Sequence, residues 1–147
     1  MTMNLKPFQR LLPVLLAIGA VHADPLPERL RSEGIYRSET QVNSEGNDYV
    51  SLLRFAPDGR VFLTHVSAPA RQEKVCEWFK PALEAPHWAK GASFQLDNNR
   101  LRFRTDSPNA TTLFDGWVDA DVLKMQLTVP TRQGLTYPLT FSFTACP

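Results

Sequence analysis

Residues 48–66 read DYVSLLRFAPDGRVFLTHV and form the clearest structural signal in the chain. Both halves are rich in β-branched, aromatic and other apolar residues, which is typical of strands. Between them, Pro57-Asp58-Gly59 fits a type I turn followed by a glycine in the left-handed conformation. The stretch therefore predicts a β-hairpin with strands at about 48–56 and 60–66.

Alternation of apolar and polar residues continues on both sides of this hairpin and predicts further strands. Residues 122–129 illustrate it, because Leu123 and Leu127 alternate with Lys124 and Gln126. The eight expected strands lie at about 34–39, 48–56, 60–66, 91–97, 100–105, 110–118, 122–129 and 135–145.

Residues 67–90 break this period and predict one short helix at about 69–79. Ser67 can accept hydrogen bonds from the free amides of a helix start, and Pro69 suits an early helical position. Val75 and Phe79 are four residues apart and so share one face of the helix. An irregular segment that holds Trp88 is expected to follow.

Eight short strands with one apolar face each must bury that face, either in a closed barrel or between two packed sheets. The connections are mostly short, so neighbouring strands should pair in order. We therefore expect an all-β fold, an eight-stranded antiparallel meander barrel, with the short helix between strands 3 and 4 closing one end. Pro138 indicates that part of the last strand lies at an edge or bulge.

Residues 1–23 have the order of features of a secretory signal peptide. Lys6 and Arg10 give a basic start, an apolar stretch follows, and Val21-His22-Ala23 places small residues where a signal peptidase cleaves. We expect the mature chain to start at Asp24 and the protein to be periplasmic or secreted. The residue directly after the cleavage site is Asp24 and not a cysteine, so a lipoprotein anchor is not expected. The apolar run is too short to span a bilayer about 30 Å thick.

Charge and length limit the classes of partner. Residues 1–23 hold two of the 16 basic residues and no acidic one, so 14 basic residues stand against 15 acidic ones in the mature chain. This balance gives no reason to expect a nucleic acid or an anionic membrane as partner. Residues 24–33 should form a flexible leader or a single helical turn, and residues 34–147 a single domain.

Cys76 and Cys146 are the only cysteines in the sequence, and an oxidising compartment favours a disulfide between them. The loop that they close is long, and chain-entropy arithmetic gives a stabilisation of roughly 4 kcal/mol. Two buried free thiols are the alternative.

The hairpin sequence from Tyr49 to Val61 resembles that of small bacterial lipocalin-like proteins. Further similarity lies in Val75 to Phe79, Lys90-Gly91, Arg100 to Phe103, and Gly116 through Leu123. The resemblance implies a calycin-type barrel of eight strands that can hold a small apolar ligand.

Aromatic residues at strand positions that are expected to point into the barrel are the main clue to function. An eight-stranded barrel is just wide enough either to be packed solid or to hold one ligand. Trp78 and Trp88, near the helix, are candidates to gate an opening. The rings expected to point inward and contact a ligand are Tyr49, Phe55, Phe103, Trp117, Tyr137 and Phe141, with Phe143 in the same register.

A protein-binding module, such as a periplasmic inhibitor or immunity protein, is the second hypothesis. Because alternate residues of a strand point to the same side, Arg100, Arg102 and Arg104 share one face, where they could bind an acidic partner. The residues 80–90 would complete the contact surface. The alternative is an outward face whose charge protects the strand from edge pairing.

No catalytic residue, cofactor or metal ligand is predicted. His65 and His87 lie far apart in sequence and no acid stands at metal-ligand spacing from either, whereas a zinc site normally needs three or four ligands. Glu73 and Glu77 share a helix face, where solvation is the simpler explanation. The serines at 51, 67 and 93 match no nucleophile-elbow pattern. The protein is therefore expected not to be an enzyme.

Overall fold

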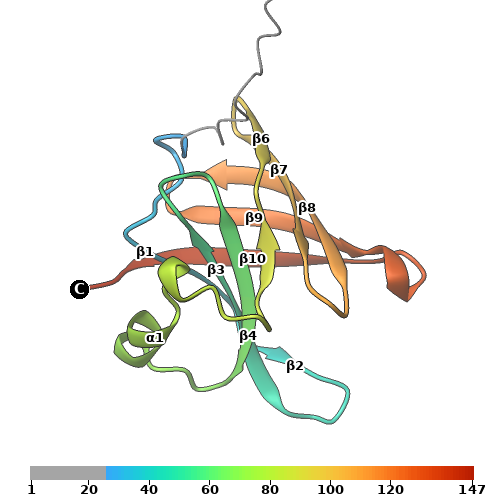
Figure 1. The fold of residues 1–147 in the computed structure, drawn as a ribbon. Coiled ribbons are helices and arrows are strands. Elements are labelled where there is room, and N and C mark those ends of the chain that lie inside the picture. The colour runs from blue at the N-terminus through green and yellow to red at the C-terminus, as the bar shows by residue number, and fades with distance from the viewer. Residues whose placement is uncertain (1–25) are drawn as a thin grey trace, which may run out of the picture.

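The computed structural model describes residues 26–147, which form a closed antiparallel β-barrel (Figure 1). The predicted signal peptide lies outside these described residues. Sequential strands pair around the ring, and the last strand pairs with the first, so the expected meander of eight strands is confirmed. The ring consists of β1 (Gly34–Ser38), β3 (Asp48–Phe55), β4 (Val61–Ser67), β5 (Ala89–Gly91), β7 (Arg100–Asp106), β8 (Thr111–Asp119), β9 (Val122–Val129) and β10 (Leu135–Ala145).

Two short strands extend the ring. β2 (Gln41–Val42) pairs with the start of β3, and β6 (Phe94–Asp97) pairs with β7. The single strand expected at 91–97 is therefore split into β5 and β6. Among the described residues, β5 meets β7 through one residue pair, Lys90 and Asp106. A Cβ atom at Gly91 would collide with the carbonyl oxygen of Arg104, so glycine allows the close crossing at this seam.

The hairpin at the centre of the sequence prediction is confirmed. β3 and β4 pair from Tyr49–Ser67 to Phe55–Val61. Gly59 donates its amide to the carbonyl of Ala56 at 3.0 Å and has a φ of 87°, the left-handed conformation that the turn requires.

Large side chains fill the centre of the barrel. The rings of Phe103 and Phe114 stack with centroids 4.3 Å apart, and Phe55 meets Phe103 edge to face at 5.7 Å. Phe55 and Phe141 have no exposed surface at all. An interior packed this closely leaves no space for a ligand between these rings.

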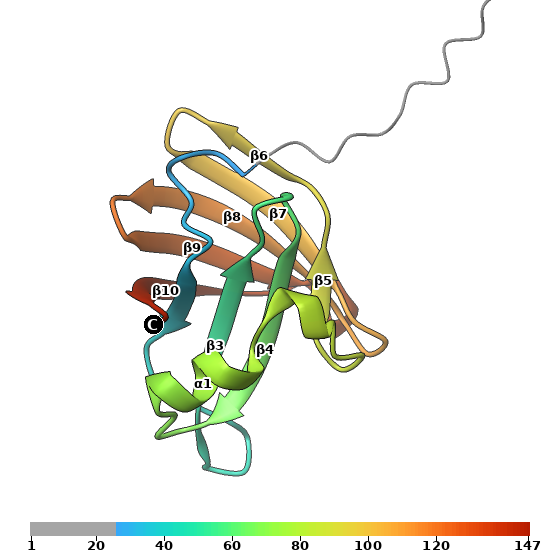
Figure 2. The same cartoon turned by 60° about the vertical axis from the view of Figure 1, so that its left-hand side comes forward.

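A second apolar layer lies outside the barrel wall (Figure 2). β3 and β4 are apolar on both faces, because Leu52 and Phe62 point outward and are buried. The helix α1 (Gln72–Trp78) covers them, together with Phe79 and Trp88 from the segment after it, which also contains the 3₁₀ turn η1 (Pro81–Leu83). The expectation that the helix closes an end of the barrel was wrong, since this outward apolar face has to be buried against something.

The helix also begins later than expected. Arg71 is the N-cap residue and makes no side-chain capping bond, so neither Ser67 nor Pro69 starts the helix. The amide of Ala68 instead donates to the carbonyl of Asp48 at 3.0 Å, which holds the chain in line with β4 beyond the strand's last residue.

The leader closes one end of the barrel. Of the two conformations expected for it, the structure has the single turn, in which the Leu30 amide donates to the carbonyl of Pro27 at 2.9 Å. Leu30 is 3% exposed and belongs to the barrel core. Arg29 donates to the carbonyl of Asn98 and Arg31 pairs with Asp121, so the leader is joined to the turns at this end.

A disulfide joins Cys76 on α1 to Cys146, one residue after β10. The predicted pairing is confirmed, and it ties the outer layer to the strand that closes the ring with β1. Such a bond is typical of an extracytoplasmic protein. Among residues 26–147, no helix has both the length and the apolar character to cross a membrane.

Candidate functional site

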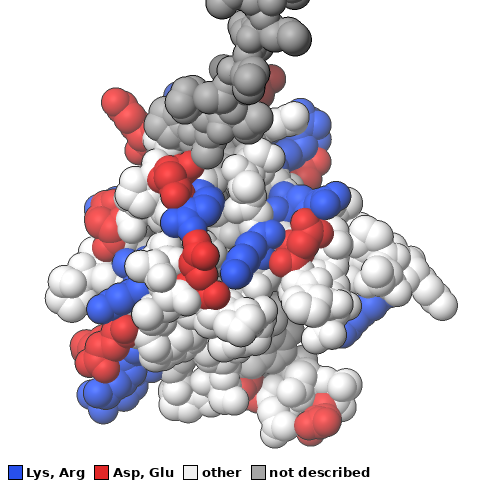
Figure 3. Space-filling model, in the orientation of Figure 1, with Lys and Arg blue, Asp and Glu red and all other residues white. Residues whose placement is uncertain are grey.

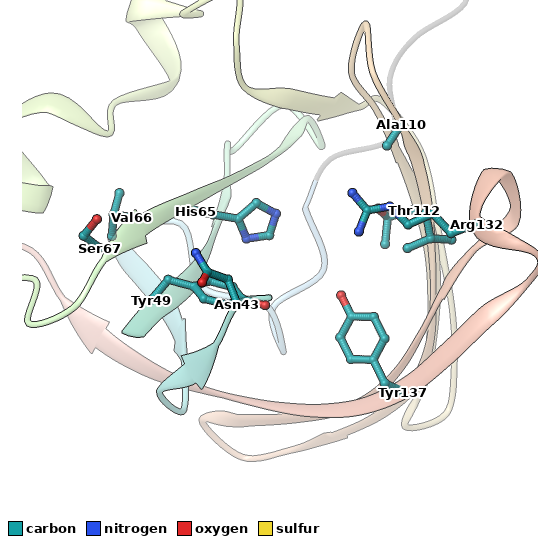
Figure 4. Close-up of a pocket in the computed structure, with 10 residues that line it drawn as sticks. Asn43, Tyr49, His65, Val66, Ser67, Ala110, Thr112, Arg132 and Tyr137 are labelled. Atoms are coloured by element: carbon teal, nitrogen blue, oxygen red, sulfur yellow. The ribbon is translucent and has the colours of Figure 1, made fainter. Parts of the chain in front are cut away.

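A cavity of about 400 Å³ lies at the end of the barrel opposite the leader (Figure 4). It is open to solvent on its outer side, and the packed aromatic centre of the barrel lies on its inner side. Its walls come from β3, β4, β8, β9 and β10, from the turns before β3 and β8, and from the 3₁₀ turn η2 (Pro130–Arg132) that links β9 to β10. The lining residues are Asn43, Tyr49, His65, Val66, Ser67, Ala110, Thr112, Val129, Arg132 and Tyr137.

The lengths of the strands explain why this end is open. β10 runs from Leu135, but β1 reaches it only as far as Phe141, the partner of Ser38. The first part of β10, with Pro138, therefore has β9 on one side and no ring strand on the other. This confirms the edge position that Pro138 indicated.

A polar network fixes the imidazole of His65 in the wall of the cavity. Its Nδ1 atom lies 2.8 Å from the hydroxyl of Ser51, which also accepts a hydrogen bond from the Gln41 side chain at 2.9 Å. Tyr49 donates its hydroxyl to Gln41 Oε1 at 3.1 Å, and its ring meets the His65 ring edge to face at 5.9 Å. Each of these side chains orients the next, so the wall is preorganised.

The surrounding protein changes the titration of two lining groups. His65 is exposed to the open cavity, and partial desolvation by the surrounding walls lowers the pKa of its imidazole. Burial likewise raises the pKa of Tyr137, the nearby Tyr49 adds to the rise, and the charge of Arg132 opposes it. Both side chains are therefore neutral near pH 7 and available for hydrogen bonding.

Stability should depend on pH through His65. Below pH 6.5, its ordinary value, an unfolded chain binds a proton that the folded protein still excludes, so acidification favours unfolding. Above that pH both states are neutral and the contribution does not vary. We expect the wild type to lose more stability than a His65→Gln variant when urea unfolding is measured at about pH 5.5 rather than at about pH 7.5. Equal losses in the two proteins would contradict this assignment.

The six aromatic residues predicted to contact a ligand fall into three groups: two line the cavity, three lie in the core, and Trp117 faces outward. Tyr49 and Tyr137 line the cavity. Phe55, Phe103 and Phe141 do point inward, but they are buried in the core below it. Phe143, which was expected to point inward as well, is partly buried and packs against the same core.

The inward orientation of Trp117 was wrong, because its side chain is 57% exposed on the outer face of β8. Phe114 and Val118 take the inward positions of this strand, and Gly116 lies between them. A one-residue shift in parity moves every side chain of a strand to the other face.

The tryptophans near the helix do not border the cavity. Trp88 is 2% exposed and packs edge to face against Phe79 with centroids 5.0 Å apart. Trp78 joins the same outer layer, 6.4 Å from Trp88. Their expected gating role is therefore not supported, because both lie on the outer side of the wall.

The arginine row of β7 faces outward. Arg100 makes a bidentate ion pair with Asp115 on β8, at 3.0 and 2.8 Å, and lowers the pKa of that carboxyl. Arg104 pairs with Asp106 at 3.0 Å. On the face that Figure 3 shows, basic and acidic side chains lie close together, and neither sign forms a continuous patch.

The contact between Ser51 and His65 is not a catalytic arrangement. Ser51 is 1% exposed, so no substrate can reach its hydroxyl. Among the described residues, no carboxylate is hydrogen-bonded to the imidazole. Residues 26–147 also contain no cluster of three His, Cys, Asp or Glu side chains that could hold a metal ion.

Sequence reasoning missed most of the polar lining. Thr112 alternates in step with the inward apolar residues Phe114 and Val118 but lies at the open end of its strand. A polar residue at a position where alternation predicts an inward apolar one indicates that the core ends there and a cavity begins. The sequence of β8 contains this signal at Thr112. Arg132 lies on a turn, where alternation says nothing about direction.

Comparisons with protein-family models, with curated proteins and with solved structures find no significant match to this chain. The closed antiparallel barrel is compatible with a lipocalin-like fold. The function must therefore be inferred from the chemistry of the site itself.

Proposed function

We propose that this protein is an exported, non-catalytic, lipocalin-like barrel that binds one small molecule at its open end. The observation that carries the proposal is the cavity of about 400 Å³ into which tyrosine, histidine and arginine side chains converge, in a barrel closed at its other end. Pockets of this size with a few convergent polar groups are typical of small-molecule sites. We propose the mouth rather than the centre as the binding site, since aromatic rings fill the centre.

Two independent features support export. The order of basic, apolar and small residues over 1–23 is that of a cleaved signal peptide. The disulfide fits an oxidising compartment. Together they support a periplasmic or secreted location.

Binding of a neutral apolar probe tests the proposal. N-phenyl-1-naphthylamine should gain fluorescence with the purified protein, because contact with the Tyr49 and Tyr137 rings would shield the bound probe from water. Truncation of both tyrosines to alanine should remove most of the gain. Trp117→Ala is the matched control, since this ring lies outside, and circular dichroism should show that each variant is folded.

Native mass spectrometry of the protein from its natural host provides a second readout. A retained mass of one small molecule per chain would support the proposal. Absence of both the retained mass and the probe signal would contradict it.

The alternative of a protein-binding surface has weaker support. Arg100 and Arg104 are already paired with carboxylates of this chain, and exposed arginines that hold such partners gain little from a second one. Arg102 remains the member of the row without an ion pair among the described residues. Loss of a captured partner on Arg102→Glu would favour this surface over the cavity.

A further inference from the structure

The cavity has an unbalanced charge. Among its lining residues, Arg132 is the one with a permanent charge, and none is acidic. Arg132 makes no ion pair with any described residue, whereas Arg31, Arg60, Arg100 and Arg104 all do. An arginine that faces a cavity without a carboxylate is ready to pair with a negative group of a ligand.

The hydrogen bonds around His65 determine which atom the cavity meets. Gln41 donates to the buried Ser51 hydroxyl, and among the described residues Nδ1 of His65 is the hydrogen-bonded partner of that hydroxyl that can accept its hydrogen, so we assign Ser51 as the donor to Nδ1. A neutral imidazole with an occupied Nδ1 acceptor carries its hydrogen on Nε2. The ring therefore offers the cavity a hydrogen-bond donor.

These donors face the same space. Figure 4 shows the guanidinium of Arg132 and the hydroxyl of Tyr137 pointing into the cavity from one side, with the His65 ring on the other. Thr112 also lines the cavity, on the same wall as Arg132. Its cross-strand neighbour Thr105 is fully buried, and its hydroxyl has no partner among the described residues.

From this arrangement we propose that the site takes a small amphiphile with a carboxylate head group. The carboxylate pairs with the planar guanidinium of Arg132 and accepts a hydrogen bond from His65 Nε2. The rings of Tyr49 and Tyr137 contact the apolar part of the molecule. A single cation matches a monoanion, and the flat fork of arginine matches the two oxygens of a carboxylate. This inference rests on the proposed function and adds the chemical class of the ligand.

Decanoate and decanol test the inference, because they share a chain length and differ in the head group. Isothermal titration calorimetry with the purified protein should give decanoate an affinity at least about tenfold higher than that of decanol. Arg132→Gln should weaken decanoate binding by about tenfold or more and leave decanol unchanged. Arg102→Gln is the control, since it removes an equal charge from the outer face of β7 and should change neither affinity.

Each of the other outcomes would overturn the carboxylate assignment, and one of them would also overturn the proposed binding function. Equal affinities for decanoate and decanol, or a decanoate preference that survives Arg132→Gln, would overturn the carboxylate assignment and leave the binding barrel standing. Binding of neither compound, together with no probe fluorescence, would overturn both proposals. A loss of decanoate binding in Arg102→Gln as large as in Arg132→Gln would show a general charge effect and also overturn the assignment.

Discussion

Phe55→Ala should lower the free energy of unfolding by about 3–5 kcal/mol. Phe55 has no exposed surface and its ring touches three others, those of Tyr36, Phe94 and Phe103, at centroid distances of 5.6, 6.3 and 5.7 Å. The substitution removes the apolar contact and leaves a void that a closed ring of strands cannot easily collapse to fill. Urea unfolding followed by tryptophan fluorescence measures the loss.

Trp117→Ala is the control for this experiment. It also removes a large ring, but from the exposed outer face of β8, and the stability should stay within about 0.5 kcal/mol of the wild type. If Trp117→Ala cost as much as Phe55→Ala, the assignment of the inner and outer faces would be wrong.

Loss of the disulfide is expected to have a similarly large effect. The bond closes a loop with a sequence separation of 70 residues, for which chain-entropy arithmetic gives roughly 4 kcal/mol. It also holds α1 against the strands that this helix covers. A variant with Cys76→Ser and Cys146→Ser should unfold at a correspondingly lower urea concentration.

Reductant provides the matched control. It should lower the stability of the wild type to that of the double variant and have no effect on the double variant itself. A wild type whose stability does not change once its thiols are shown to be reduced would contradict a stabilising role for the bond.

Most of the barrel could be predicted because alternation is a local property. Residues such as Leu123 and Leu127 show their buried face within a single strand, and short turns then impose pairing in sequence order. The meander and its closure follow from such local evidence, whereas the disulfide followed from the presence of only two cysteines in the sequence.

The position of the helix, the inner face of β8 and part of the cavity lining could not be predicted, because they depend on contacts between distant parts of the chain. Leu52 and Phe62 show in the sequence that the hairpin has a second apolar face, but no local pattern says that α1 covers it. On β8 both parities contain large apolar residues, Phe114 on one and Trp117 on the other, so alternation alone cannot choose the inner face. The site was only partly predicted for the same reason, because Arg132 reaches the cavity from a turn.

Both ends of the described chain leave the barrel far from the cavity. Leu26 donates its amide to the carbonyl of Pro57 in the turn between β3 and β4, and Cys146 donates to Glu33 just before β1. An affinity tag, a fusion partner or a linker to a solid support attached at either point would extend away from the entrance. Immobilisation through either end should therefore leave the cavity accessible to dissolved compounds, which suits the protein to capture experiments with crude extracts.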